Sequence, residues 1–183
     1  MFLSVAAAVG GQMPLPRSSQ MTRGEVFDNG VLSMNSDHSD DTIEMLKAGV
    51  QTESAEQTRS CAKQLACVLP EDIILALSGD LGTGKSTFVS GLAEAWGIEK
   101  SMQSPTYNIF HLYHAQRNLV HADAYRLEDS SQMDSLLLED FLTSPYCVAL
   151  EWPEHVQNWL PDGVWWLSFG ILREGVHHIA LHR

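Results

Sequence analysis

Basic residues are scarce in this chain of 183 residues. There are 11 lysines and arginines against 23 aspartates and glutamates, a formal net charge of −12. Tight binding of nucleic acid normally needs a basic face, because neutralising the phosphates supplies much of the affinity. We therefore expect that any role of this chain in RNA metabolism acts through a partner protein.

Cysteine is also scarce. The three cysteines, Cys61, Cys67 and Cys147, are odd in number and form no Cys-x-x-Cys pair. This pattern argues against a disulfide framework and against a zinc site, and it fits a reducing compartment. We expect the three side chains to serve as small buried hydrophobic groups.

Long apolar runs are missing as well. No stretch reaches the roughly 18 residues that a membrane-spanning helix needs. Residues 1–10 are apolar, but they lack the positively charged segment with which a secretory signal begins. We therefore expect a cytoplasmic protein without membrane attachment.

The first 50 residues show little pattern of their own. Glycines and prolines interrupt residues 10–16, and residues 35–41 are polar without apolar periodicity. Such composition is typical of a disordered segment. We therefore expect a disordered N-terminal extension over residues 1–50 and a single domain over residues 51–183.

The most informative segment is a glycine-rich turn between a strand and a helix. The apolar run Ile73–Leu77 predicts a buried strand, and Lys85–Trp96 predicts a helix. Between them Gly79, Gly84, Lys85 and Ser86 have the spacing of a phosphate-binding loop. Glycines let the backbone approach an anion, while the loop N–H groups and the helix N-terminus face the phosphates. The segment therefore predicts a nucleotide site, with the lysine on the β/γ-phosphates and the serine on Mg²⁺.

Strands and helices alternate through the rest of the domain. A helix is expected before Pro70, a β-hairpin over 108–123, a helix carrying Met133 to Phe141, a buried strand over 146–150, and a final strand pair over 164–181. This order predicts an α/β fold: a P-loop NTPase-like three-layer domain with a central mixed sheet flanked by helices.

Two carboxylates are candidates to hold the metal. A Mg²⁺-binding acid usually ends a buried strand beside the strand of the phosphate loop. Glu151 follows the more apolar run, and Asp123 follows a weaker version of the same pattern. Each also fits a strand-end carboxylate that faces water. Residue pattern alone favours Glu151 and leaves Asp123 open.

Thr106 is a candidate switch residue. It follows Pro105 in the connection between the expected loop helix and the hairpin. In nucleotide hydrolases a threonine in such a loop completes Mg²⁺ coordination and senses the γ-phosphate. An ordinary Ser-Pro-Thr turn is the competing interpretation.

Four segments, in this order, resemble the TsaE (YjeE) family: Gly79–Phe88, Ser104–Tyr107, His121–Arg126 and Glu151–Pro153. The resemblance extends from about Thr52 to the C-terminus. It implies an ATPase of bacterial tRNA threonylcarbamoyl-adenosine formation, which acts with TsaD and TsaB proteins on adenosine 37 of ANN-decoding tRNAs. The resemblance further implies that TsaD transfers the threonylcarbamoyl group and that this chain meets tRNA only through its complex with TsaD and TsaB.

The resemblance also implies roles for individual residues, with ATP and Mg²⁺ as cofactors. Lys85, Asp123, Glu151 and Thr106 are implied to take part in hydrolysis. Ser86, Glu151, Asp123 and Thr106 are implied to lie at the metal. The residues implied to bind nucleotide are Gly79, Asp80, Leu81, Gly82, Thr83, Gly84, Lys85, Ser86 and Thr87, with Glu56 and Thr58 at the start of the first helix of the domain.

The sequence departs from the family at three points, of which the long N-terminal extension is one. Thr83-Gly-Lys-Ser86 replaces the usual Ala-Gly-Lys-Thr, and serine keeps a hydroxyl for the metal. Gly175-Val176 stands where the family carries a Gly-Arg near its last hairpin, which puts a nucleotide contact from that end in doubt.

Three other functions compete with this one. A P-loop small-molecule kinase shares the loop and the size, but it needs an arginine-rich lid, and arginines are few here. A non-catalytic nucleotide sensor is disfavoured by the combined presence of Lys85, Ser86, Asp123 and Glu151. A GTPase is disfavoured because no Asn-Lys-x-Asp occurs to bind guanine.

Overall fold

A computed structural model describes residues 36–99 and 108–182. The helices are α1 (Ser36–Ala48), α2 (Ala55–Ala66), α3 (Lys85–Ala95) and α4 (Ser131–Asp134), with 3₁₀ segments η1 (Leu138–Phe141) and η2 (Pro153–Trp159). The strands are β1 (Val50–Thr52), β2 (Asp72–Ser78), β3 (Phe110–Tyr113), β4 (Asn118–Asp123), β5 (Tyr146–Glu151), β6 (Trp165–Arg173) and β7 (Val176–His182).

The strands form one mixed sheet in the order β1-β7-β6-β2-β5-β4-β3. At its centre β2 runs parallel to both β5 and β6, and β4 runs parallel to β5. The hairpin strands β3 and β7 pair antiparallel to β4 and β6, as the sequence predicts. The strand β2, which leads into the phosphate loop, is therefore buried between two parallel neighbours.

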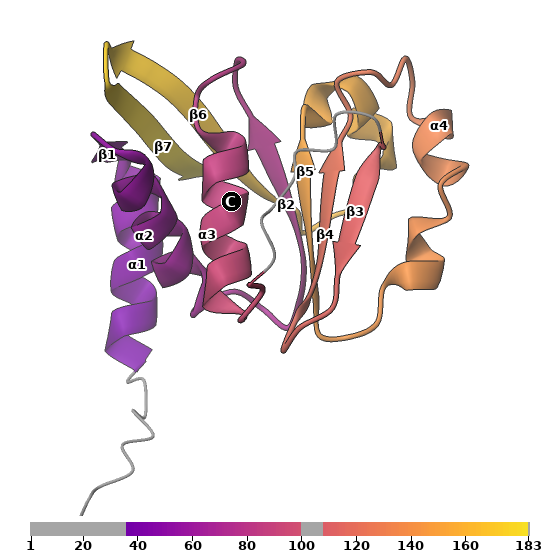
Figure 1. Cartoon of the computed structure of the whole chain (residues 1–183), viewed down its shortest axis with the longest axis horizontal. Helices are drawn as coiled ribbons and strands as arrows, with labels where there is room; N and C mark the ends of the chain where they lie inside the picture. Colours follow the sequence, from indigo (N-terminus) through magenta and orange to yellow (C-terminus); the bar gives the residue numbers. More distant parts are fainter. Residues whose placement is uncertain (1–35, 100–107, 183) are drawn as a thin grey trace, which may run out of the picture. The chain divides into compact units, whose positions relative to one another are not determined.

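Helices cover both faces of the sheet, so the predicted three-layer fold is confirmed. Figure 1 shows α1, α2 and α3 grouped apart from α4, with β2, β5, β4 and β3 between α3 and α4. Leu75 of β2 and Ala149 of β5 pack in one core cluster with Leu65 of α2 and Leu92 of α3. On the opposite face Met133 and the residues around it form a second cluster with the alternate positions of β4 and β5. The central strands are thus apolar on both sides, as buried parallel strands require.

The expectation of disorder up to residue 50 is wrong for its last part. Residues 36–48 form α1, and residues 50–52 form β1, which pairs with β7. Ile43 and Leu46 of α1 are buried in the core cluster. A short helix whose apolar side chains are few is stabilised by what it packs on, and the partner strand lies more than 120 residues further along the chain. Residues 1–35 lie outside the described residues.

The helix expected from Met133 to Phe141 is also interrupted. It divides into α4 and η1, and between them Leu137 adopts the left-handed conformation with φ of 47°. Met133 and Leu138 still point into the core, whereas Leu137 is exposed. Packing on the sheet thus selects two short turns in place of one regular helix.

The cysteines are confirmed as buried at two of three positions. Cys61 and Cys147 are buried, and burial raises the pKa of these thiols to about 11 and about 12. Cys67 is exposed at the end of α2. Within the described residues, no helix is both long and apolar enough to pass through a membrane.

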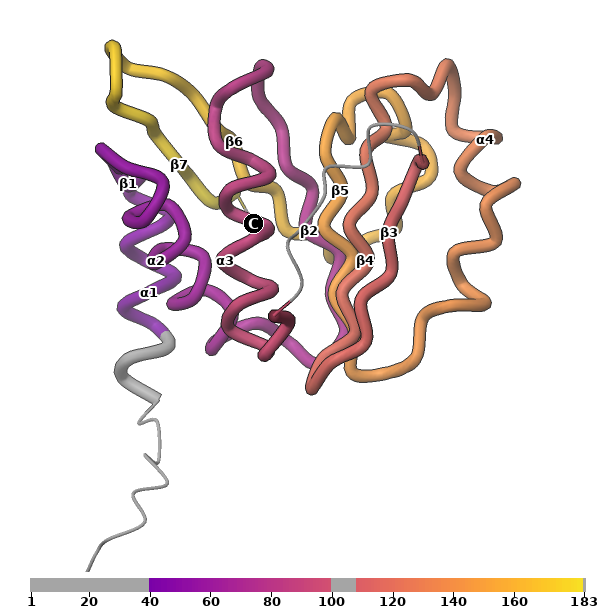
Figure 2. Tube along the Cα trace, in the orientation of Figure 1, coloured from indigo at the N-terminus to yellow at the C-terminus, as the bar shows by residue number. Residues whose placement is uncertain are grey.

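The parallel strands end at the edge of the sheet that carries the phosphate loop. Because β2, β5 and β4 run in the same direction, Leu77, Glu151 and Asp123 lie next to one another at their carboxyl ends. Figure 2 shows the loop before α3 and the β6–β7 turn at the same, upper, end of the view. Ligands of open parallel sheets bind at such carboxyl ends.

Helices α2 and α3 approach closely at Gly91. A Cβ atom added there would lie 2.5 Å from the carbonyl oxygen of Arg59 and 2.7 Å from the Cβ of Ala62. A side chain at this position would therefore push the two helices apart. The absence of a side chain at Gly91 allows the close contact between α3, the helix that follows the loop, and α2.

We predict that Gly91→Ala destabilises the fold by about 1–3 kcal/mol, the usual cost of overpacking. In a helix with free space around the glycine, the same change stabilises the fold by roughly 1 kcal/mol. The sign of the change in unfolding free energy therefore distinguishes a close helix contact from an open one. Gly170→Ala in β6 is the matched control, because a Cβ there meets nothing within 4 Å. Urea unfolding measures the free energy of unfolding of both variants. A Gly91→Ala variant as stable as wild type would contradict the close approach.

Candidate functional site

The loop between β2 and α3 depends on its glycines. Gly79, Gly82 and Gly84 have φ of 141°, 80° and 103°, values that side chains strongly disfavour. A Cβ on Gly79 would also lie 2.3 Å from the carbonyl oxygen of Phe169 in β6. The chain can therefore turn sharply beside β6 only with glycine here, and it then enters α3 at Lys85.

Lys85 lies inside the loop. Its side chain is buried, and Nζ donates hydrogen bonds to the carbonyl oxygens of Gly79 at 2.5 Å and Asp80 at 2.9 Å. The ammonium also lies 4.5 Å from the ring centre of Trp152, a cation–π contact. Burial lowers the pKa of Lys85, while nearby carboxylates, Glu151 first and then Asp123, oppose that shift. The loop thus holds one positive charge against its own backbone.

Glu151 connects α3 to the centre of the sheet. The hydroxyl of Ser86, in the first turn of α3, donates to Glu151 Oε1 at 2.7 Å. His121 of β4 lies with Nε2 at 2.8 Å from the same oxygen. Glu151 and His121 are only 5% and 1% exposed, so this contact is made almost without water.

The pKa of Glu151 reflects these contacts. Burial alone raises the pKa of this carboxyl, but the hydrogen bond and charge of His121, the hydrogen bond of Ser86 and the charge of Lys85 together lower it. The net shift is downward, so the carboxylate is ionised at neutral pH. An ionised carboxylate only accepts hydrogen bonds, and both Ser86 and His121 must therefore donate to it.

Asp123 is the second carboxylate at this edge. It pairs in register with Glu151, on the neighbouring strand, and is partly exposed. Its Oδ1 accepts a hydrogen bond from the backbone N–H of Tyr125 at 2.9 Å. Asp123 thus lies beside Glu151 and acts on the pKa of Lys85, but among the described residues no hydrogen bond joins it to Ser86.

The remaining predicted residues differ in their burial and in their contacts. Thr58 of α2 is buried, and its hydroxyl forms a hydrogen bond of 2.9 Å with the hydroxyl of Thr52. The methyl group of Thr58 lies near Gly84. Glu56 is exposed in the first turn of α2. Thr106 lies outside the described residues. In the loop itself Asp80, Leu81 and Gly82 are exposed, Thr87 is half-buried, and Thr83 is buried with its hydroxyl donating to the carbonyl of Asp80 at 2.8 Å.

Two histidines at the site were given no role by the sequence, although His121 opens one of the segments that resemble the family. His121 shares strand parity with Asp123, which is a signal that could have placed both on one face. His177 of β7 donates from Nδ1 to the carbonyl of Thr83 at 3.0 Å. No local pattern indicates this second contact, because it depends on β7 lying beside the loop.

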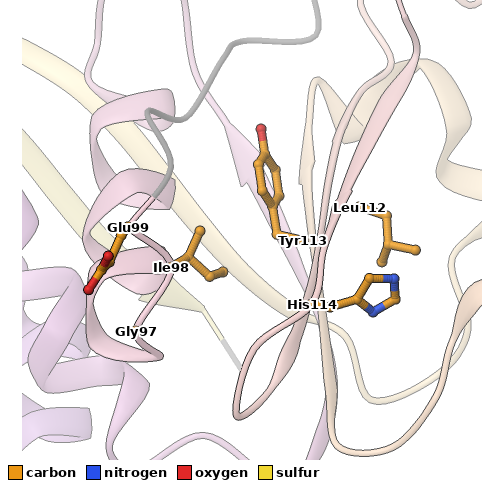
Figure 3. Close-up of a pocket in the computed structure, with 6 residues that line it drawn as sticks. All are labelled: Gly97, Ile98, Glu99, Leu112, Tyr113 and His114. Atoms are coloured by element: carbon orange, nitrogen blue, oxygen red, sulfur yellow. The ribbon is translucent and has the colours of Figure 1, made fainter.

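A separate pocket of about 310 Å³ lies away from the loop (Figure 3). It lies at the opposite end of the strands from the phosphate loop. Tyr113 pairs with Leu119 at the start of β4, whereas Asp123 ends that strand beside Glu151. It is lined by Gly97, Ile98, Glu99, Leu112, Tyr113 and His114. This pocket shares no residue with the phosphate loop.

The donor set fits Mg²⁺. Mg²⁺ prefers oxygen ligands and usually takes only one or two from protein, with phosphates and water supplying the others. Ser86 donates its hydrogen to Glu151, which leaves the lone pairs of its oxygen free for a cation. The carboxylates of Glu151 and Asp123 supply negative charge at the same edge of the sheet.

A buried parallel strand, a glycine loop that encloses a lysine, and a helix that begins with lysine and serine define a nucleotide-binding protein of the P-loop class. Within that class, residues 52–177 match the model of one family, described as threonylcarbamoyl adenosine biosynthesis protein TsaE. The match covers more than half of the chain, and the chain therefore belongs to the TsaE family.

Known relatives agree with this assignment. The chain is 30% identical to tRNA threonylcarbamoyladenosine biosynthesis protein TsaE of Treponema pallidum, over 70% of this chain and 95% of that protein. It is 36% identical to the protein of that name from Bacillus subtilis, over 61% and 70%. The crystal structure of Bacillus subtilis YdiB is similar with a TM-score of 0.59, at 28% identity, over 72% of this chain and 81% of that one.

We predict that Glu151→Gln removes part of the pH dependence of stability. A carboxyl with a lower pKa in the folded than in the unfolded chain contributes stability above its ordinary value of 4.5 and loses it as the pH falls through the folded value. The urea midpoint of wild type should therefore fall more steeply on acidification than that of the variant. Glu139→Gln, an exposed position, is the control. Equal slopes in wild type and both variants would contradict the lowered pKa.

Proposed function

We propose that this chain is the Mg²⁺-dependent, ATP-binding and ATP-hydrolysing subunit required to form the threonylcarbamoyl group on adenosine 37 of ANN-decoding tRNAs. It acts with TsaD-like and TsaB-like proteins in the cytoplasm. Membership of the TsaE family supports the pathway. The hydrogen bond from Ser86, at the start of α3 where the phosphate loop ends, to Glu151 is the observation that supports the chemistry.

Each residue has a role in this proposal. The N–H groups of the loop and of the α3 N-terminus bind the phosphates, and Lys85 moves from the loop carbonyls to the β/γ-phosphates. Ser86 and Glu151 hold the metal, with Asp123 beside them. Mg²⁺, when bound, neutralises charge on the phosphate oxygens. Thr106 remains the proposed switch residue, and Glu56 and Thr58 remain proposed nucleotide contacts.

The surface around the loop supports a protein partner. Leu81 at the loop tip is 88% exposed, and Ile171 and Leu172 on the β6–β7 hairpin are each 55% exposed. Ile171 pairs in register with His177, whose ring contacts Thr83 in the loop, so exposed apolar side chains stand on two segments that meet at the site, and this supports a protein interaction there. The net charge of −12 opposes direct binding to the tRNA backbone, so we propose that tRNA is reached through the complex.

A small-molecule kinase is the weaker alternative. Its lid would need several arginines near the transferred phosphate. Arg59 instead pairs with Glu94 at 3.4 Å, and Arg117 lies over the ring of Trp96 at 5.1 Å. Both arginines are thus engaged away from the loop.

We predict that Lys85→Ala lowers the affinity for ATP. Hydrogen bonds to a charged group contribute about 1.5–3 kcal/mol, which corresponds to roughly 10–150-fold in the dissociation constant. Lys63→Ala is the control, because Lys63 pairs with Glu94 near the far end of α3. Calorimetry measures binding, and circular dichroism verifies the fold. Wild-type affinity in Lys85→Ala would overturn the assignment of the site.

We predict that the purified chain hydrolyses ATP slowly alone and at least about tenfold faster with its TsaD-like and TsaB-like partners, since groups supplied in trans to a phosphoryl site can contribute several orders of magnitude. Modification of tRNA in the same reaction should require all three proteins. Fast hydrolysis that the partners leave unchanged would contradict the proposal. Transfer of phosphate to a metabolite in a substrate screen would favour the kinase.

A further inference from the structure

His121 is a buried histidine with only one hydrogen-bond partner among the described residues. It is 1% exposed, and Nε2 lies 2.8 Å from Glu151 Oε1. The other ring nitrogen, Nδ1, is also buried and has no partner within the part of the chain that the structure describes. The side chain is therefore directed entirely at Glu151.

The sheet register brings the two side chains together. His121 pairs in register with Ala149, two positions before Glu151 on β5. Residues two apart on a strand share a face, so His121 and Glu151 are diagonal neighbours on the face that α3 covers. Ser86 at the start of α3 reaches the same carboxylate oxygen. Three elements thus meet at one atom, Glu151 Oε1.

Among the residues that the structure describes, Nδ1 has no partner, so packing alone does not account for a histidine here. A buried polar atom without a partner costs about 1–3 kcal/mol. An apolar side chain of similar volume would avoid that cost. What histidine adds at this position is the N–H group of Nε2, which donates to a carboxylate that can only accept.

We propose that His121 is a positioning residue for the Mg²⁺ site. Its N–H group holds the carboxylate of Glu151 in the orientation in which Glu151 accepts the hydrogen of Ser86, so that the oxygen lone pairs of Ser86 face the cation. This inference rests on the proposed function, because it assigns His121 to the metal site proposed there. Residues that orient metal ligands typically change metal affinity or activity by 10–100-fold when they are replaced.

The test compares three variants in nucleotide binding. His121→Leu removes the N–H group at similar volume. His121→Gln places an amide N–H about where Nε2 lies, and His121→Asn carries the same amide one methylene too short to reach Glu151. ADP binding is measured by calorimetry in EDTA and across a Mg²⁺ titration, and thermal unfolding without metal reports the fold.

We expect His121→Leu and His121→Asn to raise the half-saturating Mg²⁺ concentration about tenfold or more. His121→Gln should return it to within about threefold of wild type, since the N–H group is restored. ADP affinity in EDTA should stay unchanged in all three, because the loop and Lys85 are intact. If His121→Leu does not fold, the half-saturating Mg²⁺ concentrations of His121→Gln and His121→Asn still test the role of the N–H group.

Equal Mg²⁺ dependence in wild type, Gln and Asn variants would overturn the positioning role while leaving the proposed function in place. Equal loss of ADP affinity with and without Mg²⁺ would also overturn it, because it would show a general role in folding. A wild-type chain whose ADP binding does not respond to Mg²⁺ would instead contradict the metal site of the proposed function.

Discussion

The buried carboxylate of Glu151 is the constraint on which the site depends. An ionised carboxylate that is 5% exposed is stable only with hydrogen-bond donors or positive charge around it. Ser86 and Lys85 supply these from the start of α3, and His121 supplies its hydrogen bond from β4. Each of these elements must therefore be in place before Glu151 can be buried, and this couples the geometry of the site to the packing of the domain.

The strand order is what makes that arrangement attainable. Because β5 lies between β2 and β4, its last residue adjoins both the strand that leads into the loop and the strand that carries His121 and Asp123. The close contact of α2 and α3 at Gly91 then positions the helix that begins with Lys85 and Ser86. A change in either the register or the helix contact displaces the groups that meet at Glu151.

Family membership and surface character both bear on the partners proposed for this site. A TsaE protein belongs to threonylcarbamoyl adenosine biosynthesis, yet this chain has a net charge of −12 and exposes Leu81 in its loop and Ile171 and Leu172 on the β6–β7 hairpin. Those features favour the proposal that the loop faces a protein surface and not an RNA backbone. The proposed dependence on partners follows from this surface as well as from the family.

The sequence by itself determined the phosphate loop, both flanking elements, the carboxylate at the end of β5 and the family, because these depend on local spacing and on apolar runs. Tertiary structure alone decided the rest. Helix α1 forms against β7, far along the chain, and η1 separates from α4 through packing on the sheet. His121 and His177 join the site only through strand register and through the proximity of β7 to the loop, since contacts between distant segments leave no periodic signal in the residues that make them.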